Sequence, residues 1–113
     1  MNFWEDQVVL ITGASRGIGA QMVKHFSALG AKVAFNYANN QAAADAVIAE
    51  CDPERTRAYK VDVRCEAEVT AMIDSIAEDL GKISILVNNA GITRDGLLMM
   101  MSTEKKLNLT WID

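Results

Sequence analysis

The sequence predicts an α/β fold in which helices cover both faces of a parallel sheet. Four short apolar runs, rich in β-branched residues, alternate with three segments of helical periodicity. Strands that alternate with helices of this length connect through right-handed crossovers, which make neighbouring strands parallel. The chain has 113 residues, 50% hydrophobic and 23% charged, which is the balance of a single globular domain. With the strands numbered along the chain, we expect the order 3-2-1-4.

The first strand and the first helix flank a glycine-rich turn. Val8–Ile11 is a continuous apolar run, as expected of a strand that is buried on both faces. After the turn, apolar side chains recur at the spacing of one helix stripe, and Gly30 follows the last of them. A glycine in that place is typical of a left-handed helix C-cap. The predicted stripe consists of Ile18, Met22, Phe26 and Leu29.

Two further strands enclose the second helix. We expect strands at residues 31–35 and 57–61, and a helix at residues 42–50. Asn39 or Asn40 is the expected N-cap of this helix, because a short side-chain oxygen accepts a hydrogen bond from a free N–H group of the first turn.

The third helix is expected to bury one stripe against the sheet and to end at Gly81. A fourth strand at residues 83–87 follows. Because the residues after it have only a weak pattern, we expect its outer edge to be bare and apolar, and to pair with another chain. The helix stripe consists of Val69, Met72, Ile73, Ile76 and Leu80.

The turn at residues 12–19 has the sequence Thr-Gly-Ala-Ser-Arg-Gly-Ile-Gly. Between a buried strand and a helix, glycines permit a tight turn, let a diphosphate approach the backbone, and let the helix pack closely on the sheet. The start of the helix adds unpaired N–H groups and a positive dipole end, which favour phosphate. The turn therefore predicts a nucleotide site, and a tight turn without a ligand is the alternative.

Three motifs follow the expected strands in order. They are T-G-x-x-x-G-x-G at residues 12–19, Asp62-Val63, and Asn-Asn-Ala-Gly at residues 88–91. Together they resemble the short-chain dehydrogenase/reductase family, which has a Rossmann-type parallel sheet. Within this family the chain is most similar to the 3-oxoacyl-[acyl-carrier-protein] reductases, with the acetoacetyl-CoA reductases as a near alternative.

The residues after the second strand favour NADP(H) over NAD(H). In this fold an acidic residue about 20 positions past the glycine turn binds the ribose hydroxyl of NAD. Residues 35–38 read Phe-Asn-Tyr-Ala, without a carboxylate to repel a 2′-phosphate, and Arg16 supplies a fixed positive charge. The resemblance implies that Ser15, Arg16 and Asn36 face the adenosine phosphate. A solvated surface arginine is the alternative for Arg16.

The resemblance also assigns the other cofactor contacts. Asp62 would bind the adenine amine through its side chain, although an aspartate before a helix also serves as a cap. The segment at residues 88–91 is expected near the adenine ribose and the nicotinamide, or it is a turn that tolerates positive φ. The expected cofactor residues of these segments are Gly13, Gly17, Ile18, Gly19, Asp62, Val63, Asn89, Ala90 and Gly91.

The resemblance implies hydride transfer from NADPH to a 3-oxoacyl thioester of acyl carrier protein or CoA, with a Tyr as proton donor and a Lys four residues later. Neither Tyr37 nor Tyr59 is followed by Lys at that spacing. We therefore expect the cofactor-binding half of such an oxidoreductase, inactive alone. A non-catalytic nucleotide-binding or interaction module is the alternative.

Asn108 is the one candidate catalytic residue, because Asn-Leu-Thr at residues 108–110 imitates the segment that carries the family's helix asparagine. The family has a longer helical stretch before that segment. Either an in-frame loss keeps Asn108 in a shifted register, or residues 105–113 are unrelated to the family, and we favour the second account. Residues 1–104 are then the NADP(H)-binding half and residues 105–113 a short tail.

Charge, hydropathy and cysteine content limit the classes of binding partner that we expect. The net charge of −4 is spread over the whole chain, so we expect no basic face for nucleic acid. No apolar run approaches the ~20 residues of a membrane span, and the N-terminus lacks a signal-peptide pattern. Cys51, Cys65 and the single His25 lack metal-ligand spacing, so we expect reduced thiols and no metal site. These features predict a cytoplasmic protein, and the resemblance implies a homo-oligomer.

Overall fold

The computed structural model describes residues 3–15, 17–90 and 110–112. In these residues five strands form one sheet in the order β3-β2-β1-β4-β5, with parallel pairing throughout. The predicted α/β class and the order 3-2-1-4 are confirmed, and a fifth strand lies outside β4. The elements are the 3-10 helix η1 (Phe3–Asp6), β1 (Val8–Ile11), α1 (Gly17–Ala28), β2 (Lys32–Tyr37), α2 (Gln41–Ala49), β3 (Thr56–Lys60), α3 (Glu66–Asp79), β4 (Ile85–Val87) and β5 (Thr110–Ile112).

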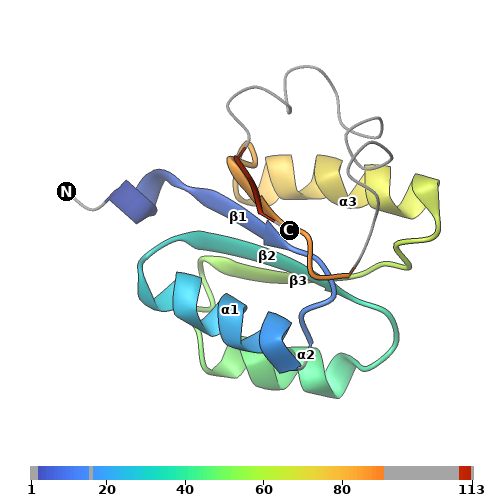
Figure 1. The fold of residues 1–113 in the computed structure, drawn as a ribbon, viewed down its shortest axis with the longest axis horizontal. Helices are drawn as coiled ribbons and strands as arrows, with labels where there is room; N and C mark the ends of the chain where they lie inside the picture. Colours follow the sequence, from blue (N-terminus) through green and yellow to red (C-terminus); the bar gives the residue numbers. More distant parts are fainter. Residues whose placement is uncertain (1–2, 16, 91–109, 113) are drawn as a thin grey trace.

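Helices α1 and α2 cover one face of the sheet, and α3 covers the other (Figure 1). Alternating side chains of β1 contribute to two separate cores. Val8 and Leu10 pack with α3, whereas Val9 and Ile11 pack with α1 and α2. All four residues of β1 are buried, which explains why its sequence is continuously apolar.

The helix ends follow the predicted capping residues. Gly30 has a left-handed φ of +101°, and its N–H donates to the carbonyl of Ser27 at 3.0 Å. Of the two candidate N-caps, Asn40 caps α2, because its side-chain oxygen accepts the N–H of Ala43 at 3.0 Å. Both caps are local, so the sequence was sufficient to predict them.

The strand boundaries differ from the expected ones by one or two residues. β2 extends to Tyr37, β3 begins at Thr56, and β4 begins at Ile85. Next to β4, the side chain of Ser84 replaces part of the backbone ladder, since its hydroxyl oxygen accepts the N–H of Val8 at 3.0 Å. The backbone ladder between β4 and β1 and this side-chain bond together hold β4 against the central strand.

The predicted stripe of α1 forms only part of the face that packs on the sheet, because Met22 and Phe26 pack against the core whereas Ile18 does not. The buried residues are Gly19, Ala20 and Val23, while Ile18 is 75% exposed and Met22 is half-buried. Small residues let α1 approach the sheet closely, and the larger side chains then lie along the rim of the contact. The prediction was wrong at Ile18, because apolar size indicated the stripe, whereas close approach selects for small side chains.

The expectation of a bare outer edge on β4 is wrong. Strand β5 pairs with β4 in parallel, with Ile85 opposite Thr110 and Val87 opposite Ile112. The N–H of Thr110 donates to the carbonyl of Ser84 at 2.8 Å. The outer edge of the described sheet therefore belongs to β5, a strand of three residues from a segment without a strand pattern.

Several predictions lie outside the described residues. These are Arg16, Gly91, Asn108 and the boundary between residues 104 and 105. In the part of the chain that the structure describes, no helix is long and apolar enough to cross a membrane. The same residues contain no group of three or more metal-ligating side chains.

Candidate nucleotide-binding site

The candidate site lies where the carboxyl ends of the parallel strands meet at one edge of the sheet. The loop after β1 is the glycine turn, and the loops after β3 and β4 begin at Val61 and Asn88. In an open α/β sheet, ligands bind beyond this edge at the point where the strand order reverses. Here that point lies between β1, which is followed by β2 on one side, and β4 on the other.

The three glycines of the turn have three different steric surroundings. Gly13 has a φ of +66°, and a Cβ built there would lie 3.1 Å from the Cβ of Ala90. A Cβ at Gly19 would lie 2.8 Å from both the Cα of Ala14 and the carbonyl oxygen of Gly13. Gly17 also has a φ of +66°, but no atom lies within 4 Å of its Cβ position. Gly13 and Gly19 therefore allow close packing, whereas Gly17 leaves backbone open at the start of α1.

The start of α1 favours an anion. The first turn of the helix contains no acidic residue, so the positive end of the helix dipole is not neutralised from within the helix. The side chain of Ser15 is half-buried beside this open backbone, and Ile18 is exposed next to it. A phosphate group fits such a place, because unpaired N–H groups and the dipole both favour negative charge.

Thr12 connects the glycine turn to the loop after β4. Its side chain is fully buried, and its hydroxyl oxygen accepts the N–H of Ala90 at 3.0 Å. The amide nitrogen of Asn89 donates to the carbonyl of Gly13 at 2.9 Å. No role was predicted for Thr12 itself. A polar residue directly after a fully apolar strand was the available signal, because a buried hydroxyl requires a partner.

The side chain of Asn36 is buried against the glycine turn and is separate from the open backbone at Gly17. The side chain is 3% exposed, its oxygen accepts the N–H of Gly13 at 2.8 Å, and its nitrogen donates to the carbonyl of Val61 at 3.2 Å. The position expected to face the adenosine phosphate is therefore occupied by a buried amide bonded to two backbone groups. Tyr37, the last residue of β2, is 9% exposed, and no carboxylate follows it before Gln41.

Asp62 forms a local ion pair. Its carboxylate oxygens lie 3.0 Å from Nε and 2.9 Å from Nη2 of Arg64, and one of them also accepts the backbone N–H of Arg64. These hydrogen bonds hold the pKa of the Asp62 carboxyl below its ordinary value. The residue that caps α3 is Cys65, which makes no side-chain cap bond, so Asp62 is bonded in a turn and not as the helix cap. Val63 is half-buried beside it.

Tyr59 is not arranged for proton transfer. The Tyr59 hydroxyl donates to Oδ2 of Asp79 at 2.8 Å. Burial and this hydrogen bond raise the pKa of Tyr59 well above its ordinary value, opposite to the shift that a proton donor near neutral pH requires.

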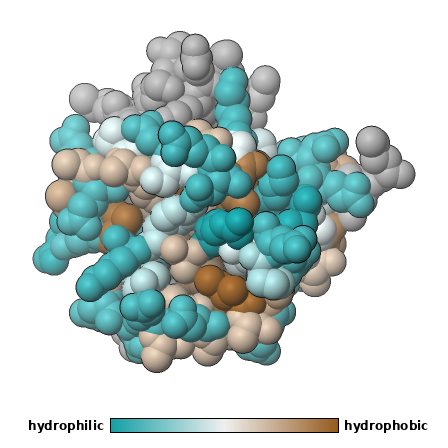
Figure 2. All heavy atoms as spheres, turned by 180° about the vertical axis from the view of Figure 1, so that it is seen from behind, coloured by the Kyte–Doolittle hydropathy of each residue, from teal (hydrophilic) through white to brown (hydrophobic). Residues whose placement is uncertain are grey.

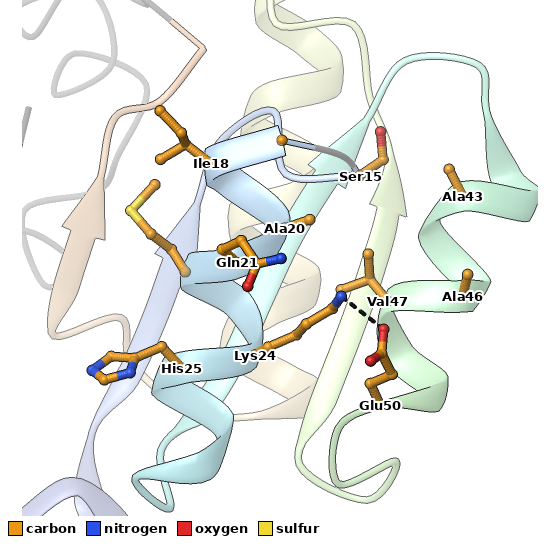
Figure 3. Close-up of a pocket in the computed structure, with 12 residues that line it drawn as sticks. Ser15, Ile18, Ala20, Gln21, Lys24, His25, Ala43, Ala46, Val47 and Glu50 are labelled. Carbon is orange, nitrogen blue, oxygen red and sulfur yellow. Dashed lines mark ion pairs between the residues drawn. The ribbon is translucent and has the colours of Figure 1, made fainter.

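A groove of about 800 Å³ lies between α1 and α2, next to the turn. Figure 3 shows Ser15 at its end nearest the turn and the ion pair between Lys24 and Glu50, 2.7 Å apart, across its other part. Ile18 and Val47 contribute apolar surface from the two helices.

On the face seen in Figure 2, hydrophobic residues form small separate patches among hydrophilic ones.

The order of the strands and the turn at the start of α1 define the first part of a Rossmann-type α/β domain. The chain belongs to the short chain dehydrogenase family, whose sequence profile matches residues 7–110. It is 43% identical to a 3-oxoacyl-[acyl-carrier-protein] reductase of Synechocystis, over 94% of this chain and 46% of that protein. It is 42% identical to an acetoacetyl-CoA reductase of Paracoccus denitrificans, over 88% of this chain and 40% of that protein.

Solved structures agree with this assignment. A short chain dehydrogenase from Bacillus anthracis has a TM-score of 0.73 and 33% identity, covering 79% of this chain and 36% of that one. An NADPH-bound short chain oxidoreductase from Pseudomonas aeruginosa, with an atypical catalytic center, has a TM-score of 0.70 and 35% identity, covering 80% of this chain and 36% of that one. The chain thus spans less than half the length of these relatives.

Proposed function

We propose that this chain binds NADP(H) at the carboxyl edge of its sheet, as the cofactor-binding half of an oxidoreductase that acts on 3-oxoacyl thioesters. The observation that carries the proposal is the open backbone at Gly17, at the start of a helix without acidic residues in its first turn. A diphosphate requires this combination of close backbone approach and favourable dipole. The similarity to 3-oxoacyl-[acyl-carrier-protein] and acetoacetyl-CoA reductases supports the substrate class.

Each part of the nucleotide has candidate residues in this chain. Gly17, Ile18 and the start of α1 are proposed to hold the diphosphate, with Gly13 and Gly19 shaping the turn. Asp62 is proposed to accept from the adenine amine, because a carboxylate has lone pairs beyond those that bind Arg64. Val63 is proposed to lie along the adenine, and Asn89, Ala90 and Gly91 are proposed to lie near the adenine ribose and the nicotinamide.

We propose a preference for NADP(H) over NAD(H). The buried end of β2 offers no carboxylate that would bind the ribose hydroxyls of NAD or repel a 2′-phosphate. Ser15 and Arg16 precede the open backbone at Gly17, and an arginine recognises a phosphate through two parallel hydrogen bonds. We assign the 2′-phosphate to these two side chains.

When bound, the nicotinamide supplies a hydride for the ketone carbon of the thioester substrate. The residues of this chain bind and orient the nucleotide, and the buried Thr12 keeps the loop after β4 in place beside the turn. For the proton, neither Tyr37 nor Tyr59 has the Tyr-Lys spacing of the family, and Asn108 is proposed only for a water relay. We therefore expect these 113 residues to bind nucleotide without reducing a substrate.

A non-catalytic nucleotide-binding module is the second candidate function. Strand β5 favours it, because residues 110–112 of this chain occupy the edge of β4 where another strand of a larger sheet would pair. Co-purification with a longer reductase would favour this candidate. Cytoplasmic location and homo-oligomer formation remain parts of the proposal, and size-exclusion chromatography with light scattering measures the second.

Calorimetric titration with NADPH, and with NADH as the control, tests the proposal. We expect saturable binding that is tighter for NADPH. The variant Gly17→Ala should weaken binding at least about tenfold, because it places a methyl group where the diphosphate lies and strains a positive φ. Gly81→Ala is the matched control, since Gly81 also has a positive φ, +115°, but ends α3. Absence of binding in the wild type, or equal binding by Gly17→Ala, contradicts the proposal.

A further inference from the structure

The side chain of Asn36 joins two loops that the sheet does not join directly. Its strand, β2, lies between β1 and β3, which make no ladder with each other. The Asn36 oxygen accepts the N–H of Gly13, in the loop after β1, and the Asn36 nitrogen donates to the carbonyl of Val61, directly after β3. One amide therefore spans the sheet from the glycine turn to the residue that precedes Asp62.

The two hydrogen bonds fix the orientation of the Asn36 side-chain amide, with its oxygen toward Gly13 and its nitrogen toward Val61. Gly13 presents a donor and Val61 presents an acceptor, and the side-chain amide of Asn36 satisfies both because its oxygen accepts while its nitrogen donates. The backbone carbonyl of Asn36 accepts the N–H of Ala14 at 3.1 Å, which adds a third bond to the same turn. At 3% exposure, these bonds are shielded from water, and their loss would leave buried backbone groups without partners.

We propose that Asn36 is a positioning residue that sets the glycine turn and the Asp62 loop at the spacing needed to bind the diphosphate and the adenine of one nucleotide. The inference rests on the proposed nucleotide function. It departs from the expectation that Asn36 contacts the adenosine phosphate, because a buried amide has no surface for such a contact. Asn36 then affects nucleotides with and without a 2′-phosphate equally.

The variant Asn36→Ala tests the inference, with Thr56→Val as the matched control. Thr56 is also buried, at 2% exposure, on the adjacent strand β3, but its hydroxyl has no hydrogen-bond partner. We expect Asn36→Ala to weaken the binding of NADPH and of NADH by the same factor, about tenfold, with their ratio unchanged. Thr56→Val should bind both nucleotides as the wild type does. A selective loss of NADPH affinity in Asn36→Ala would make Asn36 a phosphate ligand and overturn the inference.

A measurement without nucleotide separates this inference from the proposed function. In amide NMR spectra, Asn36→Ala should accelerate hydrogen exchange at Gly13, shift the amide of Asp62, which shares a peptide group with the Val61 carbonyl, and also shift the signals of Arg64, which lies further along the loop. A change confined to Gly13 overturns the inference, even if the wild type binds NADPH. If the wild type binds neither nucleotide, the proposed function fails and the NMR result still decides whether Asn36 links the two loops.

Asn36→Ser provides the same measurements if Asn36→Ala does not fold. Serine is neutral and polar, but its side chain is too short to reach both Gly13 and Val61. We expect equal losses for NADPH and NADH and shifted Asp62 signals in this variant as well. Wild-type signals at Asp62 in Asn36→Ser contradict the proposed link between the two loops.

Discussion

The glycine turn and the loop after β3 belong to the same candidate site but are held in opposite ways. The turn depends on bonds between residues that are far apart in the sequence. Gly13 bonds to Asn36, 23 residues away, and Thr12 bonds to Ala90, 78 residues away. Such bonds form only after the strands have assembled, so the geometry of the turn and the stability of the fold depend on each other.

The loop after β3 is tied to β2 at Val61, which bonds to Tyr37 and Asn36, and from Asp62 onward its bonds join neighbouring residues. Asp62 bonds to Arg64, two residues away, and the Arg64 side chain is 87% exposed. Exposed pairs of this kind contribute little to stability. Changes in the turn should therefore lower the free energy of unfolding as well as alter the site. Changes in the Asp62 loop should alter the site alone.

The largest effect is expected at the helix side of the turn. A Cβ at Gly19 would lie 2.8 Å from two backbone atoms, of Ala14 and Gly13, which cannot move without shifting the turn. Gly19→Ala should therefore lower the free energy of unfolding by about 1–3 kcal/mol, measured by urea denaturation. An unfolding midpoint equal to that of the wild type would show that α1 does not approach the turn this closely.

A smaller loss is expected from Thr12→Val, which keeps the size of the side chain and removes its hydroxyl. The N–H of Ala90 then loses its acceptor, and the partly buried hydrogen bond between the two loops is lost, which should cost about 1–2 kcal/mol of unfolding free energy. Thr56→Val is the control, because the same substitution there removes a buried hydroxyl without a partner. Equal losses in the two variants would remove the distinction between a bonded and an unbonded threonine.

The smallest effect is expected in the Asp62 loop. Arg64→Ala should leave the melting temperature at pH 7 unchanged, and should raise the pKa of Asp62 toward the ordinary value of about 3.9, measured by NMR titration. Because the folded-state pKa of Asp62 is lowered, the contribution of its ion pair is present above that ordinary value and is lost as the pH falls through the folded-state pKa. A clear loss of stability at pH 7 in Arg64→Ala contradicts the separation of the two loops.

Local patterns predicted much of the fold and less of the site. The apolar run of β1, the C-cap at Gly30 and the N-cap at Asn40 depend on neighbouring residues, and all three are confirmed. The exposed position of Ile18 was missed, because it depends on how closely α1 packs on the sheet. The bonds of Asn36 were missed as well, because they require knowing which backbone groups two other strands place beside it.

The short segment of residues 88–90 connects strand β5 to the glycine turn. The N–H of Asn88 donates to the carbonyl of Ile112 at 2.7 Å, and two residues later the N–H of Ala90 donates to Thr12 in the turn. If a ligand at the turn strengthens the pairing of β5 with β4 through this segment, thermodynamic coupling requires that the pairing of β5 raise the affinity for that ligand by the same factor.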